Sequence, residues 1–85
     1  MKKYHLAKWI KIEIRGKVEE ALMYSENEFS CLKSAKIAFR STETEFKFVI
    51  ESAVDEDDEF KIVNGYEFFP LVGWLSFRFK EEYYL

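Results

Sequence analysis

Cys31 and His5 are the single cysteine and the single histidine of the chain, so they are its only candidates for a thiol nucleophile and its base. Such a thiol needs the base within hydrogen-bond reach and a third group that orients the base. Cys31 lies beside the apolar side of an expected helix, where a cysteine is usually a small core residue. His5 falls in a basic N-terminal stretch that we expect to be exposed. We therefore predict that the protein is not an enzyme.

The same scarcity bears on metals. With one histidine and one cysteine, a zinc site would need two or more carboxylates at positions that nothing in the sequence indicates. A filled core accounts better for the many phenylalanines than a ligand cavity of ~300 Å³ or more does. We predict no catalytic residues, no metal and no cofactor.

A run of adjacent carboxylates is the strongest charge feature. It consists of Asp55, Glu56, Asp57, Asp58 and Glu59. An EF-hand loop that began at Asp55 would need glycine at its sixth position and glutamate at its twelfth, whereas the chain has Phe60 and Tyr66 there. The run is either a solvated turn between two strands or an acidic loop that meets a basic partner, whose association it would accelerate in a salt-dependent way.

Charge is unevenly distributed along the chain, which has a net charge of −3. Residues 1–17 contain six basic residues and one acidic residue, whereas residues 41–68 contain nine acidic residues and two lysines. The overall acidity argues against a general nucleic-acid binder, but it leaves room for a local basic surface.

Two tryptophans and several cations suggest where that basic surface would be. They lie on the polar sides of the first and last expected strands and, if those strands were neighbours, would form a platform on which single-stranded nucleic acid stacks. The chain lacks the glycine-aromatic signature of an RRM domain. The residues of this alternative site are Trp9, Lys11, Arg15, Trp74, Arg78 and Lys80.

Alternation of apolar and charged residues predicts strands, each with one buried and one wet side, at residues 8–15, 44–53 and 74–80. Residues 17–24 fit either a strand or a helix. We favour a strand, because Ser25 and Glu28 have the spacing of a capping box that begins a helix just afterwards. Apolar residues at three- and four-residue steps extend that helix over about residues 26–40.

The strongest local signal is Asn64-Gly65 between two apolar runs. This dipeptide favours the positive φ values of a type I′ turn, so it predicts a hairpin between residues 60–63 and 66–69. Gly16 predicts a turn after the first strand. Pro70 either ends the strand that precedes it or places that strand at an edge of the sheet.

These elements predict a single α+β domain over residues 1–85, with the order β-β-α-β-β-β-β. It is a small antiparallel sheet of five to six strands with one helix, about 26–40, packed on one face. The alternative is a small, partly closed barrel plugged by the helix. One cysteine cannot form an internal disulfide, and no apolar stretch has the length of a signal peptide or a membrane span, so we expect a cytoplasmic protein without a membrane partner.

Small size, missing catalytic residues and a concentrated acidic loop favour a non-catalytic intracellular protein-binding module. We expect an inhibitor or adaptor of the antitoxin, immunity-protein or phage counter-defence kind, either monomeric or a homodimer. The acidic loop, Asp55, Glu56, Asp57, Asp58 and Glu59, would occupy a basic site on the partner, with Tyr66, Trp74 and Tyr83 as exposed aromatic anchors. The alternative is a small nucleic-acid-binding module that uses the Trp/Arg/Lys sheet face.

Overall fold

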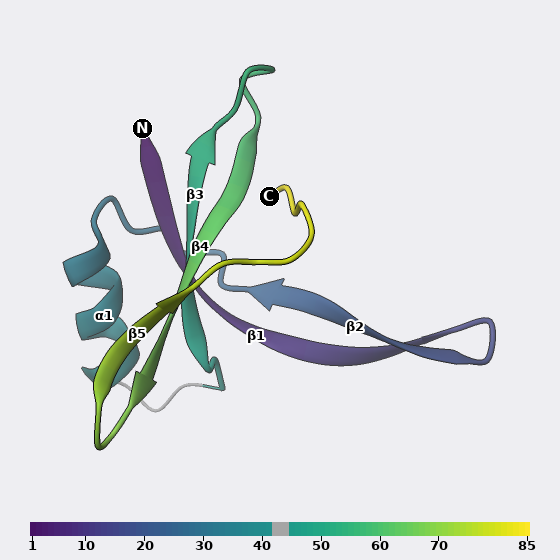
Figure 1. Ribbon diagram of the computed structural model, residues 1–85, viewed down its shortest axis with the longest axis horizontal. Helices are drawn as coiled ribbons and strands as arrows, with labels where there is room; N and C mark the ends of the chain where they lie inside the picture. Colours follow the sequence, from purple (N-terminus) through teal and green to yellow (C-terminus); the bar gives the residue numbers. More distant parts are fainter. Residues whose placement is uncertain (42–44) are drawn as a thin grey trace.

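Five antiparallel strands form one sheet in the spatial order β2-β1-β3-β4-β5, and helix α1 packs against one of its faces (Figure 1). The computed structural model describes residues 1–41 and 45–85. The elements are β1 (Lys2–Ile14), β2 (Lys17–Tyr24), α1 (Leu32–Ser41), β3 (Phe48–Val54), β4 (Phe60–Phe69) and β5 (Gly73–Phe77). The expected α+β class is confirmed, with the order β-β-α-β-β-β. The sheet is open, with β2 and β5 at its edges, so the barrel alternative is wrong.

Strand β1 is longer than expected and connects two parts of the sheet. Its first half, residues 2–7, pairs with β3, and residues 7–14 pair with β2. The turn between β1 and β2 has positive φ at Arg15 and Gly16, and residues 17–24 form the strand that we favoured. Because β1 begins at Lys2, His5 lies inside the sheet and is only 4% exposed. The expectation of an exposed His5 is therefore wrong.

Helix α1 begins at Leu32, six residues later than expected. The Oγ of Ser25 accepts a hydrogen bond from the Leu6 N–H and donates one to the Asn27 carbonyl, so it does not cap a helix. Phe29 forms an antiparallel bridge with Tyr4 through two backbone hydrogen bonds of 2.9 and 2.8 Å. Pairing with β1 thus competes successfully with the local helical preference of residues 26–31.

Asn64 and Gly65 do not form a turn, which corrects the prediction of a hairpin there. They lie in the middle of β4, where Asn64 pairs with Glu51 of β3 and Gly65 pairs with both Ile50 of β3 and Phe77 of β5. The glycine is needed because the ring of Phe77 lies against its Cα, where a Cβ would overlap the ring. The sheet consequently has five strands, and the strand that Pro70 follows ends at Phe69 as expected.

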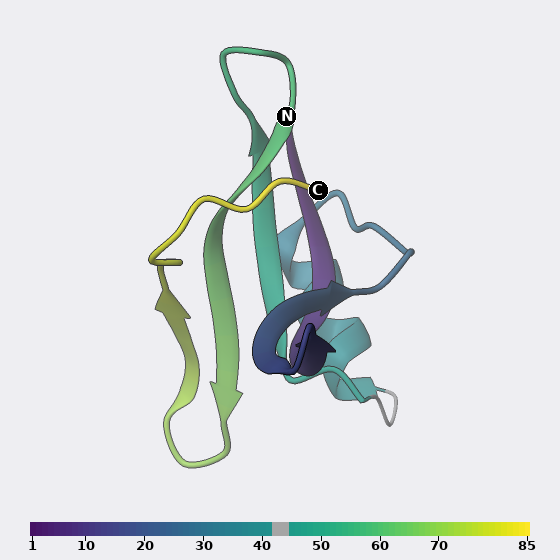
Figure 2. The ribbon, with the colours of Figure 1, turned by 90° about the vertical axis from the view of Figure 1, so that its right-hand side faces the viewer.

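Both faces of the sheet carry a core. On the α1 face, Tyr4, Leu6 and Val49 pack with Ala35 of the helix. The opposite face is covered by Phe79 and Tyr83 of the C-terminal segment, residues 78–85, which crosses the strands on the side away from α1 (Figures 1 and 2). Its buried residues are Ala7, Phe48, Ile50 and Ile62. Residues 48–52 of β3 are therefore all buried, where alternation predicted one wet side.

The distal part of the β1–β2 hairpin projects away from the rest of the domain (Figure 1). Its side chains are largely exposed, and Ile14 and Val18 are 49% and 67% exposed. In residues 1–41 and 45–85, no helix has the length and apolar character that a membrane crossing requires.

Candidate functional site

The acidic loop, residues 55–59, joins β3 to β4 at the tip of their hairpin (Figure 1). One oxygen of Asp55, Oδ1, accepts hydrogen bonds from the backbone N–H groups of Asp57 and Glu59, both at 2.9 Å. The Asp55 N–H donates to the Glu59 carbonyl at 2.8 Å. Asp58 has a φ of 58°, a conformation that aspartate tolerates better than most residues. Asp55 therefore holds the loop in one shape, a role that we did not foresee.

The other loop carboxylates keep their charge available to solvent. Glu56, Asp57, Asp58 and Glu59 are exposed, and no lysine or arginine of residues 1–41 and 45–85 forms an ion pair with them. The nearby N-terminal lysines are engaged elsewhere, Lys2 with Glu51 and Lys3 with Glu28. The loop is thus a preformed, uncompensated patch of negative charge.

The aromatic residues expected to anchor a partner are not gathered around this loop. Tyr66 donates a hydrogen bond to buried Glu51. Tyr83 packs with Trp9 and Phe79 on the sheet face opposite α1. Trp74 lies beside α1. An exposed aromatic residue that does border the loop is Tyr84, which is 48% exposed and lines a cleft with Asp55, Glu56 and Asp57.

Tyr84 reaches this position because it forms a bridge with Lys61 at the start of β4. Burial, and then the charges of Glu82 and Asp55, raise the pKa of Tyr84 above its ordinary value. Lys61 borders the same cleft, but its ammonium is paired with Glu82. Sequence reasoning missed Tyr84 because nothing local shows that the C-terminal segment returns to the β3–β4 hairpin.

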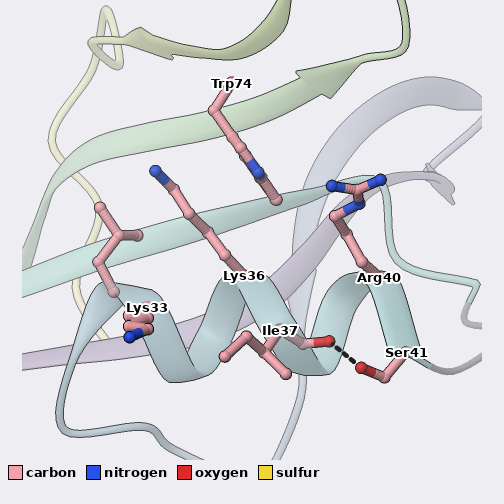
Figure 3. A pocket seen from close by; sticks show the side chains of 7 residues that line it. Lys33, Lys36, Ile37, Arg40, Ser41 and Trp74 are labelled. Atoms are coloured by element: carbon pink, nitrogen blue, oxygen red, sulfur yellow. Dashed lines mark hydrogen bonds between the residues drawn. The ribbon is translucent and has the colours of Figure 1, made fainter.

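A second recess, the Trp74 cleft, lies between α1 and β5 and has a volume of about 670 Å³ (Figure 3). Its lining includes Leu32, Lys33, Lys36, Ile37, Arg40 and Trp74. The Lys36 ammonium lies 5.2 Å from the centre of the Trp74 ring, and the Arg40 guanidinium lies 4.4 Å from that of Phe68. Phe39 and Phe68 pack against Trp74 and set its orientation.

The Trp74 cleft is basic. Among the residues that the structure describes, Lys33, Lys36 and Arg40 have no carboxylate within ion-pair distance. Their spacing along the chain, at steps of three and four, places them on one side of a helix. That spacing was visible in the sequence and could have identified this basic helix surface.

The stacking platform that we expected from the two tryptophans does not form. Strands β1 and β5 are separated by β3 and β4, and Trp9 and Trp74 belong to opposite faces of the sheet. Arg78 and Lys80 border a recess that also contains Trp9. Lys11 and Arg15 lie on the projecting β1–β2 hairpin and are exposed.

A buried carboxylate, Glu51, organises the polar interior on the α1 side of the sheet. It accepts hydrogen bonds from the hydroxyls of Tyr4 (2.9 Å) and Tyr66 (3.2 Å) and from the Asn64 amide (2.9 Å), and the Lys2 ammonium lies at 3.8 Å. Burial alone would raise the pKa of Glu51, but the hydrogen bonds from Asn64 and Tyr4 and the charge of Lys2 hold it below its ordinary value. Burial and the bond to Glu51 raise the pKa of Tyr4 to about 12.

Cys31 and His5 do not bond to each other and so form no nucleophile–base pair. Cys31 is exposed, against our expectation of a core position, and its Sγ lies 3.0 Å from the Ser34 hydroxyl. His5 bonds through Nδ1 to the Ser25 carbonyl on the sheet face opposite α1. Among the described residues, no group of three or more His, Cys, Asp or Glu side chains could hold a metal ion.

Comparison of the chain with protein-family models, with curated proteins and with solved structures finds no match in any of the three. The case for a function therefore rests on the geometry of the acidic loop and of the Trp74 cleft.

Proposed function

We propose that the protein is a non-catalytic intracellular binding module that docks its acidic loop onto a basic site of a partner protein. The supporting observation is that four exposed carboxylates, Glu56, Asp57, Asp58 and Glu59, form no ion pair with any lysine or arginine of residues 1–41 and 45–85. Asp55 holds the loop that carries them in place. The role is that of an inhibitor or adaptor, as in antitoxins, immunity proteins and phage counter-defence proteins.

Two physical consequences make this loop suited to docking. Its shape is already fixed by backbone hydrogen bonds to Asp55, so binding loses little conformational entropy. Its uncompensated charge accelerates encounter with a positively charged surface, and salt weakens that effect. Tyr84 lies beside the loop and supplies the kind of aromatic contact that interfaces favour.

Charge reversal tests this function. The partner is first captured with a tagged copy of the chain, and its association rate is then measured for a variant carrying Glu56→Lys, Asp57→Lys and Asp58→Lys. We expect the rate to fall by about tenfold or more at low salt, with a smaller difference at high salt.

The matched control carries Glu13→Lys, Glu19→Lys and Glu20→Lys on the β1–β2 hairpin, three exposed positions with the same change in net charge. This control should associate nearly as fast as the natural chain. Equal association rates for the loop variant and the natural chain would overturn the proposed function.

A second function is favoured by one observation, the basic Trp74 cleft. Lys36 and Arg40, beside Trp74, offer cations and a ring to single-stranded nucleic acid. Fluorescence anisotropy with single-stranded oligonucleotides at ~50 mM salt, where screening is modest, should then show binding that Lys36→Glu abolishes. Lys47→Glu, an exposed position outside the Trp74 cleft, is the control. Absence of binding under these conditions would eliminate this alternative.

A further inference from the structure

A smaller cleft, the His5 cleft, lies at the base of the acidic loop and has a volume of about 430 Å³. It is on the sheet face opposite α1, and its lining includes residues from the start of β1 and Leu85 of the C-terminal segment. Its lining includes Lys3, His5, Tyr24, Glu28, Glu59 and Phe60. Glu59 belongs to the acidic loop as well, so the loop and the His5 cleft form one continuous surface.

The imidazole of His5 presents an unused acceptor to this region. Its Nδ1 lies 2.9 Å from the Ser25 carbonyl, and a carbonyl oxygen only accepts hydrogen bonds. Nδ1 therefore carries the hydrogen, and Nε2 of the neutral ring keeps its lone pair. Nε2 is buried and has no hydrogen-bond partner among the described residues, and the His5 side chain is only 6% exposed.

The surroundings of Nε2 favour a cation. The Oε2 of Glu28 lies 4.0 Å from Nε2, and Glu59 brings a second carboxylate to the His5 cleft. The ammonium of Lys3 already shows this preference, since it lies 3.1 Å from Glu28 Oε2 and 4.2 Å from the centre of the Phe60 ring. No hydrogen bond joins Lys3 to Nε2, so this internal cation leaves the buried acceptor without a donor.

A guanidinium matches this arrangement better than an ammonium does. Its N–H groups form a planar fork that can donate to Nε2 of His5 and to the Glu28 carboxylate together. Its flat face can also stack on an aromatic ring such as Phe60. Lys3 is a competitor whose side chain is 29% exposed and can turn outward when another cation enters.

We propose that the His5 cleft binds an arginine side chain of the partner, with Nε2 of His5 and the carboxylate of Glu28 accepting hydrogen bonds from its guanidinium. This inference rests on the proposed function, because it names the group of the basic partner that inserts beside the acidic loop. Glu59 belongs to the acidic loop and also lines the His5 cleft, so its negative charge contributes to both contacts with the partner.

Nuclear magnetic resonance of the full ¹⁵N-labelled chain at pH 8 tests the inference with ethylguanidinium as the probe. The His5 Nε2 resonance and the amide resonances of Glu28 and Phe60 should shift saturably with the probe. Ethylammonium at equal ionic strength should bind at least about fivefold more weakly, because it lacks the planar fork. No saturable shift, or equal binding of the two probes, would overturn the inference.

Variants make the test specific. Glu28→Gln should weaken ethylguanidinium binding by about tenfold, since it removes the charged acceptor. Glu26→Gln, an exposed control outside the lining of the His5 cleft, should leave it unchanged. Lys3→Met should strengthen binding, because it removes the internal competitor. An unchanged affinity in both Glu28→Gln and Lys3→Met would also overturn the inference.

The two proposals fail in different ways. If ethylguanidinium does not bind but reversal of the acidic loop still slows association, the arginine inference is wrong and the proposed function stands. If ethylguanidinium binds saturably but loop reversal has no effect on the partner, the proposed function is wrong.

Discussion

The ring of Phe77, on β5, lies against the backbone of Gly65, on β4, and leaves no space for a side chain at residue 65. The two residues are direct partners in the antiparallel register. The same ring packs against Phe48 and Phe79, so it is held from several sides and cannot easily move away. The glycine of an apparent turn signal is thus a packing requirement of the sheet.

We expect Gly65→Ala to lower the free energy of unfolding by about 1–3 kcal/mol, because the new methyl group overpacks this contact. Urea unfolding measures the loss. In a double-mutant cycle with Phe77→Ala, the two changes should be coupled by about 1 kcal/mol, since removal of the ring makes room for the methyl group. Strict additivity of the two losses would contradict the close contact.

Glu51→Gln should lower the free energy of unfolding by about 1–3 kcal/mol at pH 7, because it weakens charge-assisted hydrogen bonds to Tyr4 and Asn64. The pKa of Glu51 is lower in the folded chain than the ordinary value of about 4.3 in an unfolded one. Its stabilisation is therefore complete above about pH 4.3 and is lost as the pH falls through the folded value. Urea unfolding should show that the free energies of unfolding of the natural chain and of Glu51→Gln converge in acid. A difference that does not change with pH would disprove the stabilising role of the Glu51 charge.

The free energy of unfolding should fall at high pH, because the stabilisation that protonated Tyr4 provides is then lost. Its pKa is raised to about 12 in the folded chain, whereas an unfolded tyrosine titrates near 10. The unfolded chain releases this proton first, so the stabilisation is complete below about pH 10 and is lost as the pH rises towards 12. Between these values the urea midpoint of the natural chain should fall more steeply than that of Tyr4→Phe. The same pH dependence of the urea midpoint in both chains would refute the raised pKa of Tyr4.

Cys31 should react readily with thiol reagents in the folded protein. Hydrogen bonds from the Ser34 hydroxyl and the Ser34 backbone lower the pKa of the exposed Cys31 thiol. Ser34→Ala should slow alkylation by iodoacetamide at pH 7.5 by about two- to fivefold, since less thiolate is present. Ser30→Ala, an exposed position without a bond to the sulfur, is the control. Equal rates in both variants would show that Ser34 has no effect on the thiol.

Asp55→Ala should loosen the acidic loop, because two backbone N–H groups lose their acceptor. The expected cost is about 1–2 kcal/mol. Hydrogen exchange should accelerate at the amides of Asp57 and Glu59, whereas Asp58→Asn, which can keep the same backbone conformation, should leave these rates unchanged. Unchanged exchange in Asp55→Ala would mean that the loop is held in some other way.

Local patterns determined most of the secondary structure. Alternation located strands near residues 8–15, 44–53 and 74–80, although the observed strands are Lys2–Ile14, Phe48–Val54 and Gly73–Phe77 and residue 44 lies outside the described residues. Gly16 identified the first turn, and the run at residues 55–59 identified an exposed loop, because these features depend on neighbouring residues alone. The choice of a strand for residues 17–24 was correct for the same reason. Fold class and the acidic part of the candidate site were therefore predictable.

The errors share one physical cause, which is contact between residues distant in the chain. Ser25 could have capped a helix, but the Leu6 N–H of β1 donates to its hydroxyl instead. Asn64-Gly65 has the composition of a turn, but both residues pair with β3, Gly65 also pairs with β5, and the ring of Phe77 requires the glycine.

From the amino-acid pattern alone we could predict that an aromatic-rich α+β sheet displays an acidic loop. Three features became evident only in the fold: buried His5 has an acceptor without a partner among the described residues, Glu51 accepts hydrogen bonds from two tyrosines, and Tyr84 reaches the acidic loop. The reason is that burial and hydrogen-bond partners depend on which strands and segments become neighbours. The packing of the whole chain determines these neighbours, and the spacing of residues along the sequence does not reveal them.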